Sequence, residues 1–354
     1  MSTAARRDRL REVLVGRGLD GAFVTELVNV RYLTGFTGSN GAVLVPVEGE
    51  AVLLTDGRYQ DQAAAEAPDV ELAVTRELLA VGAGRTSGRW AVETHALSVD
   101  DHTLLAAAVE GTELVSLERA VETLRVVKDE PELDALRRAC AISVQAWEEL
   151  VAGPVVGRTE RQLARQLEAR MLDLGAEAIA FETILAAGEN SAIPHHHPTD
   201  RVVQRGDLLK TDFGARVDGY HADCTRTAVV GPPADWQREI HAAVRASQAA
   251  GVDALVAGTP VADTWHAAVD VLDASGWRES FTTGLGHGVG LVIHEDPFLA
   301  PSHPGTLDRR TAVTMEPGIY LPGRGGVRIE DTVIVTEGRP EVLTTMTRDL
   351  LEIG

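Results

Sequence analysis

The sequence of 354 residues has very few cysteines, only Cys140 and Cys224. Two thiols cannot build a disulfide framework, and this pair fits no paired-cysteine zinc signature, so side-chain packing must hold the fold together. We expect Cys224 to be a small buried residue and not a nucleophile.

Long apolar runs are also missing. No stretch approaches the roughly 20 apolar residues that a membrane-spanning helix needs. The first residues, MSTAARRDRL, begin a charged amphipathic pattern and contain no apolar region of the kind found in a signal peptide. The sequence therefore predicts a cytoplasmic protein with no membrane partner.

Basic residues are scarce relative to acidic ones, 33 against 53, and the formal net charge is -20. This charge repels phosphate backbones, which argues against nucleic acid as a partner. Surplus acidic residues usually serve solubility, but a few of them can also form a cation site.

The first part of the chain alternates between helical and strand patterns. Apolar residues at helical spacing and short β-rich runs bounded by Gly, Asp or Glu predict an α/β domain over residues 1–124. The expected helix covers residues 5–19, and the expected strands lie within residues 21–26, 41–47, 50–55 and 112–117.

The rest of the chain, residues 125–354, has a different pattern. A long helix is expected over residues 128–152, because an acidic first turn with a proline precedes about six turns of helical spacing. Further helices, at 159–175 and 236–256, alternate with hairpin-like strands. This pattern predicts an α+β domain with an antiparallel sheet.

Two acidic residues lie in strands that should be buried, Asp212 in KTDFG and Asp223 in HADCTRT. An even-length turn around VDG makes the two strands partners and places both carboxylates on one face, opposite or diagonal to each other. Two buried carboxylates repel each other unless they are protonated or bind a cation. A cation is the simpler explanation.

A second hairpin repeats this arrangement, with Glu316 in MEPGIY and Glu330 in VRIEDTV. An odd-length turn centred near Gly323 places both carboxylates on one face, together with Arg328. We expect Arg328 to pair with a carboxylate of this group.

Between the hairpins, the glycine-rich segment GLGHGVGLVIHEDP presents His287 and His294. Four carboxylates and one imidazole give oxygen-rich ligation with one nitrogen, which suits two divalent ions. Mn²⁺ is the expected metal, with Co²⁺, Zn²⁺ or Fe²⁺ as alternatives.

The segments TDFG, DGYHADCTRT, GLGHGVGL, MEPGIY and RIEDT resemble the five metal-ligand motifs of the pita-bread metallopeptidases. Within that group the chain is most similar to Xaa-Pro aminopeptidases and Xaa-Pro dipeptidases (prolidases). NVRYLTGFTGSNG and TDGRYQDQA are similar to the creatinase-type amino-terminal domain of the same enzymes. The resemblance implies a pita-bread catalytic domain, two divalent metal ions, a proline-containing peptide as substrate and a homodimer or larger homo-oligomer.

The resemblance also implies a role for each ligand. Asp223 and Glu330 would bridge the two ions. Asp212 would complete the coordination of the first ion, and His287 and Glu316 would complete that of the second.

Further roles follow from the same resemblance. Glu316 would move the proton during hydrolysis, His294 would hydrogen-bond the developing oxyanion, and Arg328 would lie at the active site. His195 of IPHHH would bind substrate, although the adjacent His196 and His197 offer the same chemistry.

One position departs from the pattern. Relatives commonly have a histidine four residues before the ligand histidine, and this chain has Thr283 there. A threonine hydroxyl can hydrogen-bond but cannot carry a proton charge near neutral pH.

Three functions remain open. The first is an Xaa-Pro aminopeptidase, which removes the first residue from peptides with proline second. The second is an Xaa-Pro dipeptidase, which needs a cation near the proline carboxylate. If Arg328 is already paired, the pocket lacks that cation, and tripeptides should be cleaved faster than dipeptides. The third is a catalytically silent peptide-binding relative, which the complete ligand set disfavours.

Overall fold

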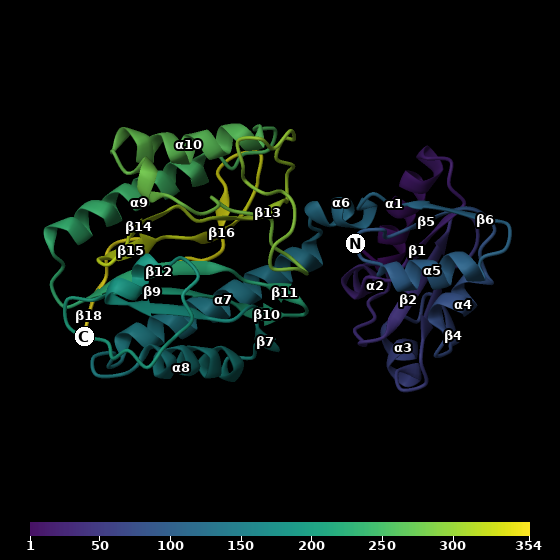
Figure 1. Ribbon diagram of the computed structural model, residues 1–354, viewed down its shortest axis with the longest axis horizontal. Coiled ribbons are helices and arrows are strands. Elements are labelled where there is room, and N and C mark those ends of the chain that lie inside the picture. The colour runs from purple at the N-terminus through teal and green to yellow at the C-terminus, as the bar shows by residue number, and fades with distance from the viewer. The chain divides into compact units, whose positions relative to one another are not determined.

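The computed structural model describes residues 1–354 and divides into two units, Met1–Arg125 and Val126–Gly354 (Figure 1). No helix in either unit combines the length and the apolar character that crossing a bilayer requires. Both cysteines are buried and free. Burial raises the pKa of Cys140 to about 12, so this thiol is unreactive at neutral pH.

The first unit is built on one mixed sheet of six strands, in the order β4-β3-β2-β1-β5-β6. The pairs β1–β2 and β2–β3 are antiparallel, and the remaining pairs are parallel. The strands are β1 Gly21–Val24, β2 Gly41–Pro46, β3 Val52–Thr55, β4 Glu71–Val74, β5 Gly88–Val92 and β6 Thr112–Ser116.

Helices connect these strands and cover the sheet, which agrees with the predicted α/β class. One apolar core lies between the sheet and the helices α4 and α5, and the helices α1 and α2 also pack buried apolar residues against β1 and β2. The helices are α1 Thr3–Gly16, α2 Leu27–Thr34, α3 Gln60–Glu66, α4 Leu78–Ala83, α5 Val99–Ala108 and α6 Ala120–Val126.

The second unit contains several small, mainly antiparallel sheets, as the α+β prediction requires. One has the order β18-β12-β9-β8, and others have the orders β11-β10-β7, β13-β16-β17 and β14-β15. The strands are β7 Ala178–Ile179, β8 Ile184–Ala187, β9 Leu208–Phe213, β10 Ala215–Val217, β11 Tyr220–His221, β12 Cys224–Val230, β13 Ala312–Met315, β14 Gly318–Leu321, β15 Gly325–Arg328, β16 Asp331–Ile334, β17 Glu341–Val342 and β18 Glu352–Ile353.

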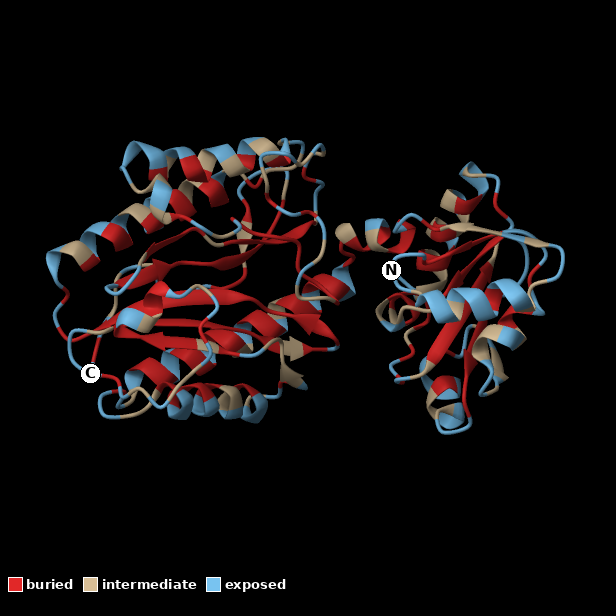
Figure 2. Cartoon of the chain, viewed as in Figure 1, coloured by how far each residue is buried: buried red, intermediate tan, exposed pale blue.

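Two pairs of long helices enclose the strands of the second unit, as Figure 1 shows. α7 and α8 lie on one side, and α9 and α10 lie on the other. Their inner surfaces and the strands are buried, and their outer surfaces are exposed (Figure 2). The helices are α7 Glu130–Ala152, α8 Glu160–Asp173, α9 Asp235–Asp253 and α10 Val261–Ala274.

Local signals explain where these helices begin. Asp129 and Thr159 cap α7 and α8 in reciprocal capping boxes, and Pro131 lies in the first turn of α7. Helix α10 was not predicted, although its buried residues Val261, Ala268 and Leu272 have the same helical spacing.

The strands β9 and β12 are buried on both faces, and the two faces have different surroundings. Leu209 and Phe213 of β9 pack in one core with α7 and α8. Leu208 belongs to the other core, with α9 and α10. Because side chains alternate along a strand, Lys210 and Asp212 share the face of Leu208.

Candidate metal centre and substrate pocket

The first pair of acidic residues shares a face through the pairing of β9 with β12. Asp212 is opposite Thr225, two residues after Asp223, so the two carboxylates are diagonal neighbours. The turn between β10 and β11 encloses Asp218 and Gly219, because Val217 pairs with Tyr220. The predicted even-length turn and shared face are confirmed.

Asp223 lies just outside the ladder, between β11 and β12, where the two chain segments approach closely. A Cβ atom on Gly214 would lie 1.8 Å from the carbonyl oxygen of Ala222. Only glycine fits at this position, which explains the glycine of TDFG.

The second pair of acidic residues lies in one interrupted hairpin. Gly318 pairs with Arg328 in β14–β15, and Met315 pairs with Asp331 in β13–β16, so both ladders keep the same register. Glu316 and Glu330 lie in the interval between the ladders. The loop that joins β14 to β15 is odd in length, because Leu321 pairs with Gly325. The predicted register is confirmed.

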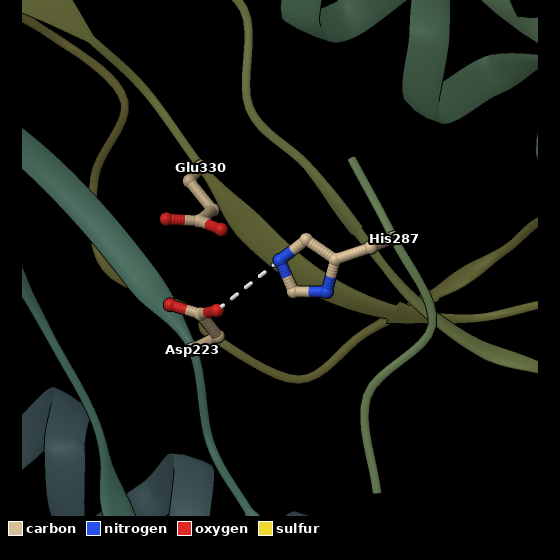
Figure 3. A group of neighbouring side chains, drawn as sticks. All are labelled: Asp223, His287 and Glu330. Carbon is tan, nitrogen blue, oxygen red and sulfur yellow. Dashed lines mark ion pairs between the residues drawn. The ribbon is translucent and has the colours of Figure 1, made fainter. Parts of the chain in front are cut away.

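Three of the predicted ligands meet in a compact group, Asp223, His287 and Glu330 (Figure 3). One ligand atom from each lies within 4.8 Å of the others, and all three side chains are buried. The Nε2 atom of His287 lies 3.6 Å from Asp223 Oδ2 and 3.5 Å from Glu316 Oε1. The group can therefore supply carboxylate oxygens and one imidazole nitrogen to a common point.

Hydrogen bonding fixes the orientation of the His287 ring. Its Nδ1 donates to the carbonyl oxygen of Gly288 at 2.9 Å, which leaves Nε2 with its lone pair toward the carboxylates. Burial lowers the pKa of His287 to about 4, so the imidazole is neutral at pH 7. A neutral imidazole is the form that binds a metal ion.

Glycines on both sides of His287 allow the backbone to enter this crowded region. A Cβ on Gly286 would lie 2.2 Å from the carbonyl oxygen of Thr314, and one on Gly288 would lie 2.2 Å from that of Asp296. The glycines of GLGHGVG are therefore required by close packing.

Asp212 lies near this group but is bonded differently. Arg328 is buried, and its Nη2 donates to Asp212 Oδ2. Its Nε donates to Thr225 Oγ1 at 3.0 Å, and Thr225 Oγ1 in turn donates to Glu330 Oε2 at 2.7 Å. The expected pairing of Arg328 with a carboxylate of the site is confirmed, and Asp212 is the partner.

The site carries more negative charge than Arg328 balances. Burial and then the charge of Glu330 raise the pKa of Asp223 well above its ordinary value, and burial and then Glu316 do the same for Glu330. Burial raises the pKa of Glu316 to about 7. Oδ1 of Asp212 is buried without a hydrogen-bond partner. Uncompensated buried carboxylates with an unused lone pair fit divalent cations.

This charge imbalance gives a stability prediction for Glu316→Gln in the metal-free protein. The folded-state pKa of Glu316 is raised, so the folded protein binds this proton more tightly, and stability falls as pH rises from about 4.5 to about 7. The variant lacks this loss. The Tm of metal-free Glu316→Gln should therefore rise relative to wild type between pH 5 and pH 7.5, measured by calorimetry after chelation. A constant difference would contradict the raised pKa.

The acidic group opens into a cavity of about 570 Å³. All five predicted metal ligands line it, together with His195, His294 and Thr283. The His294 ring meets the His287 ring edge-on, with 4.4 Å between ring centroids. Arg328 is not among the lining residues and lies behind Asp212. The substrate residues predicted from the sequence thus face the same cavity as the ligands.

The structure distinguishes the three adjacent histidines. His196 is buried and its Nε2 lies 2.8 Å from Oε2 of Glu160. His197 is exposed and its Nδ1 lies 3.4 Å from Glu182 Oε1. All three histidines line the cavity, but His195 is exposed there and has no carboxylate partner, so it is the histidine best placed for a ligand.

Several residues that support the site were not predicted. Arg226 donates to the carbonyl oxygen of Glu330 at 2.6 Å and to Asp331 Oδ1 at 2.7 Å. Asp331 also accepts from Gln248 Nε2 and Arg348 Nε. The available signal was the strand TRT, in which polar residues occupy a buried strand without interruption.

The sequence was also compared with known proteins. Residues 134–337 match metallopeptidase family M24, and residues 6–127 match the creatinase/prolidase N-terminal domain. An Xaa-Pro dipeptidase of Pyrococcus furiosus is 33% identical over 98% of this chain and 99% of its own length.

Solved structures agree with these matches. An Xaa-Pro dipeptidase from Bacillus anthracis superposes with a TM-score of 0.96 at 34% identity, covering 99% of this chain and 100% of that one. An X-Pro aminopeptidase from Thermotoga maritima superposes with a TM-score of 0.90 at 33% identity, covering 98% of this chain and 99% of that one. The predicted pita-bread domain and creatinase-type amino-terminal domain are confirmed.

Proposed function

Because the chain belongs to metallopeptidase family M24 and is a metallopeptidase by that membership, we propose that it is a metal-dependent Xaa-Pro dipeptidase. The observation that carries the proposal is the end-to-end similarity to proteins named Xaa-Pro dipeptidase, both in sequence and in structure. The cavity of about 570 Å³ is in the size range of small-ligand sites and suits a dipeptide.

The proposal reverses the preference that the sequence suggested. Arg328 is paired with Asp212, as expected for an open aminopeptidase pocket. An imidazole at the cavity is nevertheless available as the partner of the proline carboxylate. An imidazole N–H donates to a carboxylate in either protonation state, and His195 is exposed at the cavity. We therefore assign His195 to the substrate carboxylate.

The residues that would hold two divalent ions are the five predicted ligands. Asp223 and Glu330 are proposed to bridge the ions, with Asp212 on one and His287 and Glu316 on the other. When bound, the two ions would supply an acidified water and polarise the scissile carbonyl. Buried carboxylates, a neutral imidazole and the unpartnered Oδ1 of Asp212 support this assignment.

The protein's own groups are proposed to move the proton and to stabilise charge. Burial raises the pKa of Glu316 to about 7, which lets this carboxyl accept and return a proton near neutral pH. His294 lies beside His287 at the cavity and is proposed to donate a hydrogen bond to the developing oxyanion. Burial lowers the pKa of His294, so its neutral form is the donor at pH 7.

Substrate length tests the proposal. After loading with Mn²⁺, we expect kcat/KM for an Xaa-Pro dipeptide to exceed that for the matching Xaa-Pro-Xaa tripeptide by about tenfold or more, which corresponds to roughly 1.4 kcal/mol from one paired carboxylate. Amidation of the dipeptide carboxylate should cause a similar loss.

An Xaa-Pro aminopeptidase is the second candidate, supported by the similarity to the Thermotoga maritima enzyme. Faster cleavage of the tripeptide would favour it over the dipeptidase. If the metal-loaded protein cleaves neither the dipeptide nor the tripeptide, the result would favour a peptide-binding relative without catalysis.

Three further features belong to the proposal. Mn²⁺ is proposed as the native metal, the homodimer as the assembly, and the cytoplasm as the location. The oxygen-rich ligand set supports Mn²⁺ over softer ions. Metal analysis of protein purified without added metal, and sedimentation of the same sample, would test the first two.

A further inference from the structure

The residues on both sides of His195 are each held by buried side chains, which we call the two anchors. The carbonyl oxygen of Pro194, on its amino-terminal side, accepts hydrogen bonds from the buried side chains of Lys210 and Arg328. The ring of His196, on its carboxyl-terminal side, contacts a buried carboxylate. His195 itself is exposed at the cavity.

The first anchor comes from strand β9 and the second hairpin. Lys210 is fully buried, and its Nζ donates to the carbonyl oxygens of Ile193 at 2.6 Å and Pro194 at 3.2 Å. Arg328 Nη1 donates to the same Pro194 oxygen at 3.3 Å. No carboxylate pairs with Lys210, whose Nζ lies 5.2 Å from the centre of the Tyr320 ring.

The second anchor is Glu160, at the start of α8. Its side chain is fully buried and accepts hydrogen bonds from Ala187, Asn190 and Thr199. Its Oε2 also lies 2.8 Å from His196 Nε2. Every one of these partners belongs to residues 187–199, the segment that carries His195.

Burying a lysine without a carboxylate partner costs stability, and such a residue persists where its hydrogen bonds serve another purpose. Both of its acceptors are backbone atoms of one turn, next to the histidine assigned to substrate. We propose that Lys210 is a positioning residue for His195, acting with Glu160 through the backbone of the turn at residues 193–196. This proposal rests on the proposed function, because it assumes that His195 binds the substrate carboxylate.

Of the two side chains in the first anchor, Lys210 is the better one to substitute in a test. Arg328 also bonds Asp212, so a change there would disturb the metal centre directly. Lys210 has no hydrogen bond to a predicted metal ligand, and methionine matches its length without a polar atom. Lys210→Met should therefore leave the metal content intact.

The test compares Lys210→Met with wild type in the full-length, Mn²⁺-loaded protein. Displacement of His195 should lower kcat/KM for an Xaa-Pro dipeptide about 10- to 100-fold, mainly through a higher KM. Lys210→Gln, which keeps a donor, should recover part of this loss. In the double variant with His195→Ala, the loss should not exceed that of His195→Ala alone, because both changes remove one function.

Thr211→Val is the matched control. Thr211 is buried on the opposite face of β9, and its hydroxyl has no hydrogen-bond partner. This variant should keep kcat/KM within about twofold of wild type, since it removes no interaction.

A readout without turnover separates this proposal from the proposed function. The ¹H–¹³C resonance of the His195 ring, assigned from the spectrum of His195→Ala, should shift or broaden in Lys210→Met and stay unchanged in Thr211→Val. An unchanged resonance would overturn the positioning role, even if the enzyme cleaves dipeptides. A shifted resonance in Lys210→Met, together with a wild-type protein that cleaves no Xaa-Pro peptide, would keep the positioning role and refute the proposed function. Additive losses of kcat/KM in the double variant would also overturn the positioning role of Lys210.

Discussion

Chelation of divalent metal is expected to abolish cleavage of Xaa-Pro dipeptides, and addition of Mn²⁺ or Co²⁺ should restore it. Burial raises the pKa of Glu316, the proposed proton carrier, to about 7, and such a group is too weak a base to deprotonate water unaided at neutral pH. A loss of about 10³-fold or more corresponds to the several kcal/mol that a bound ion contributes to a hydrolytic transition state. Chromogenic assay and elemental analysis of the same samples would measure it.

Stability gives an independent check on the same step. Ions that bind the folded state alone stabilise it by mass action, by about 2.7 kcal/mol at a free concentration 100 times Kd. Added Mn²⁺ should therefore raise the Tm of the chelated protein. Full activity in protein shown to be free of metal would refute the dinuclear assignment.

The arrangement of the acidic residues was predictable because strands have a strict period of two. Once the turn at Asp218 and Gly219 is recognised, Asp212 and Asp223 must share a face, and the observed register agrees. The same rule places Glu316 and Glu330 together across the second hairpin. The glycines beside His287 mark where two chain segments approach closely.

The three histidines of IPHHH could not be distinguished from sequence, because the deciding contact is tertiary. Glu160, 36 positions before His196, engages the ring of that histidine, although His196 also lines the cavity. Its own sequence signal, an acidic first residue of a capped helix, normally indicates only a helix start. Likewise, nothing local to Lys210 indicates that its amine reaches the carbonyl of Pro194.

Substrate length was the weakest prediction for a related reason. The pairing of Arg328 with a site carboxylate followed from its position on the strand. That pairing did not exclude another residue as the partner of the substrate's carboxylate. His195 reaches the cavity from a loop after β8, far along the chain from the second hairpin. A specificity determined by such a loop cannot be read from the hairpin alone.

Asp223 is one of the two carboxylates that we propose to bridge the ions. It is buried, and burial together with Glu330 raises its pKa well above the ordinary value. Its Oδ2 is 3.6 Å from His287 Nε2, and it belongs to the compact group with His287 and Glu330. Replacement by the isosteric amide removes a negative charge and one of the two proposed bridging groups, with little change in volume.

We expect Asp223→Asn to lower kcat/KM about 10³-fold and to lose at least one of the two ions in metal analysis. His294→Ala is the comparison variant, because it should also lower kcat/KM but retain both ions. The metal-free variant should be more stable than metal-free wild type at pH 7.5, since one of several mutually repelling buried carboxylates is gone. Each kcal/mol gained would raise Tm by about 1 to 2 °C in a chain of this length. Higher apo stability with two ions still tightly bound would mean that Asp223 is buried acid but not a bridging ligand.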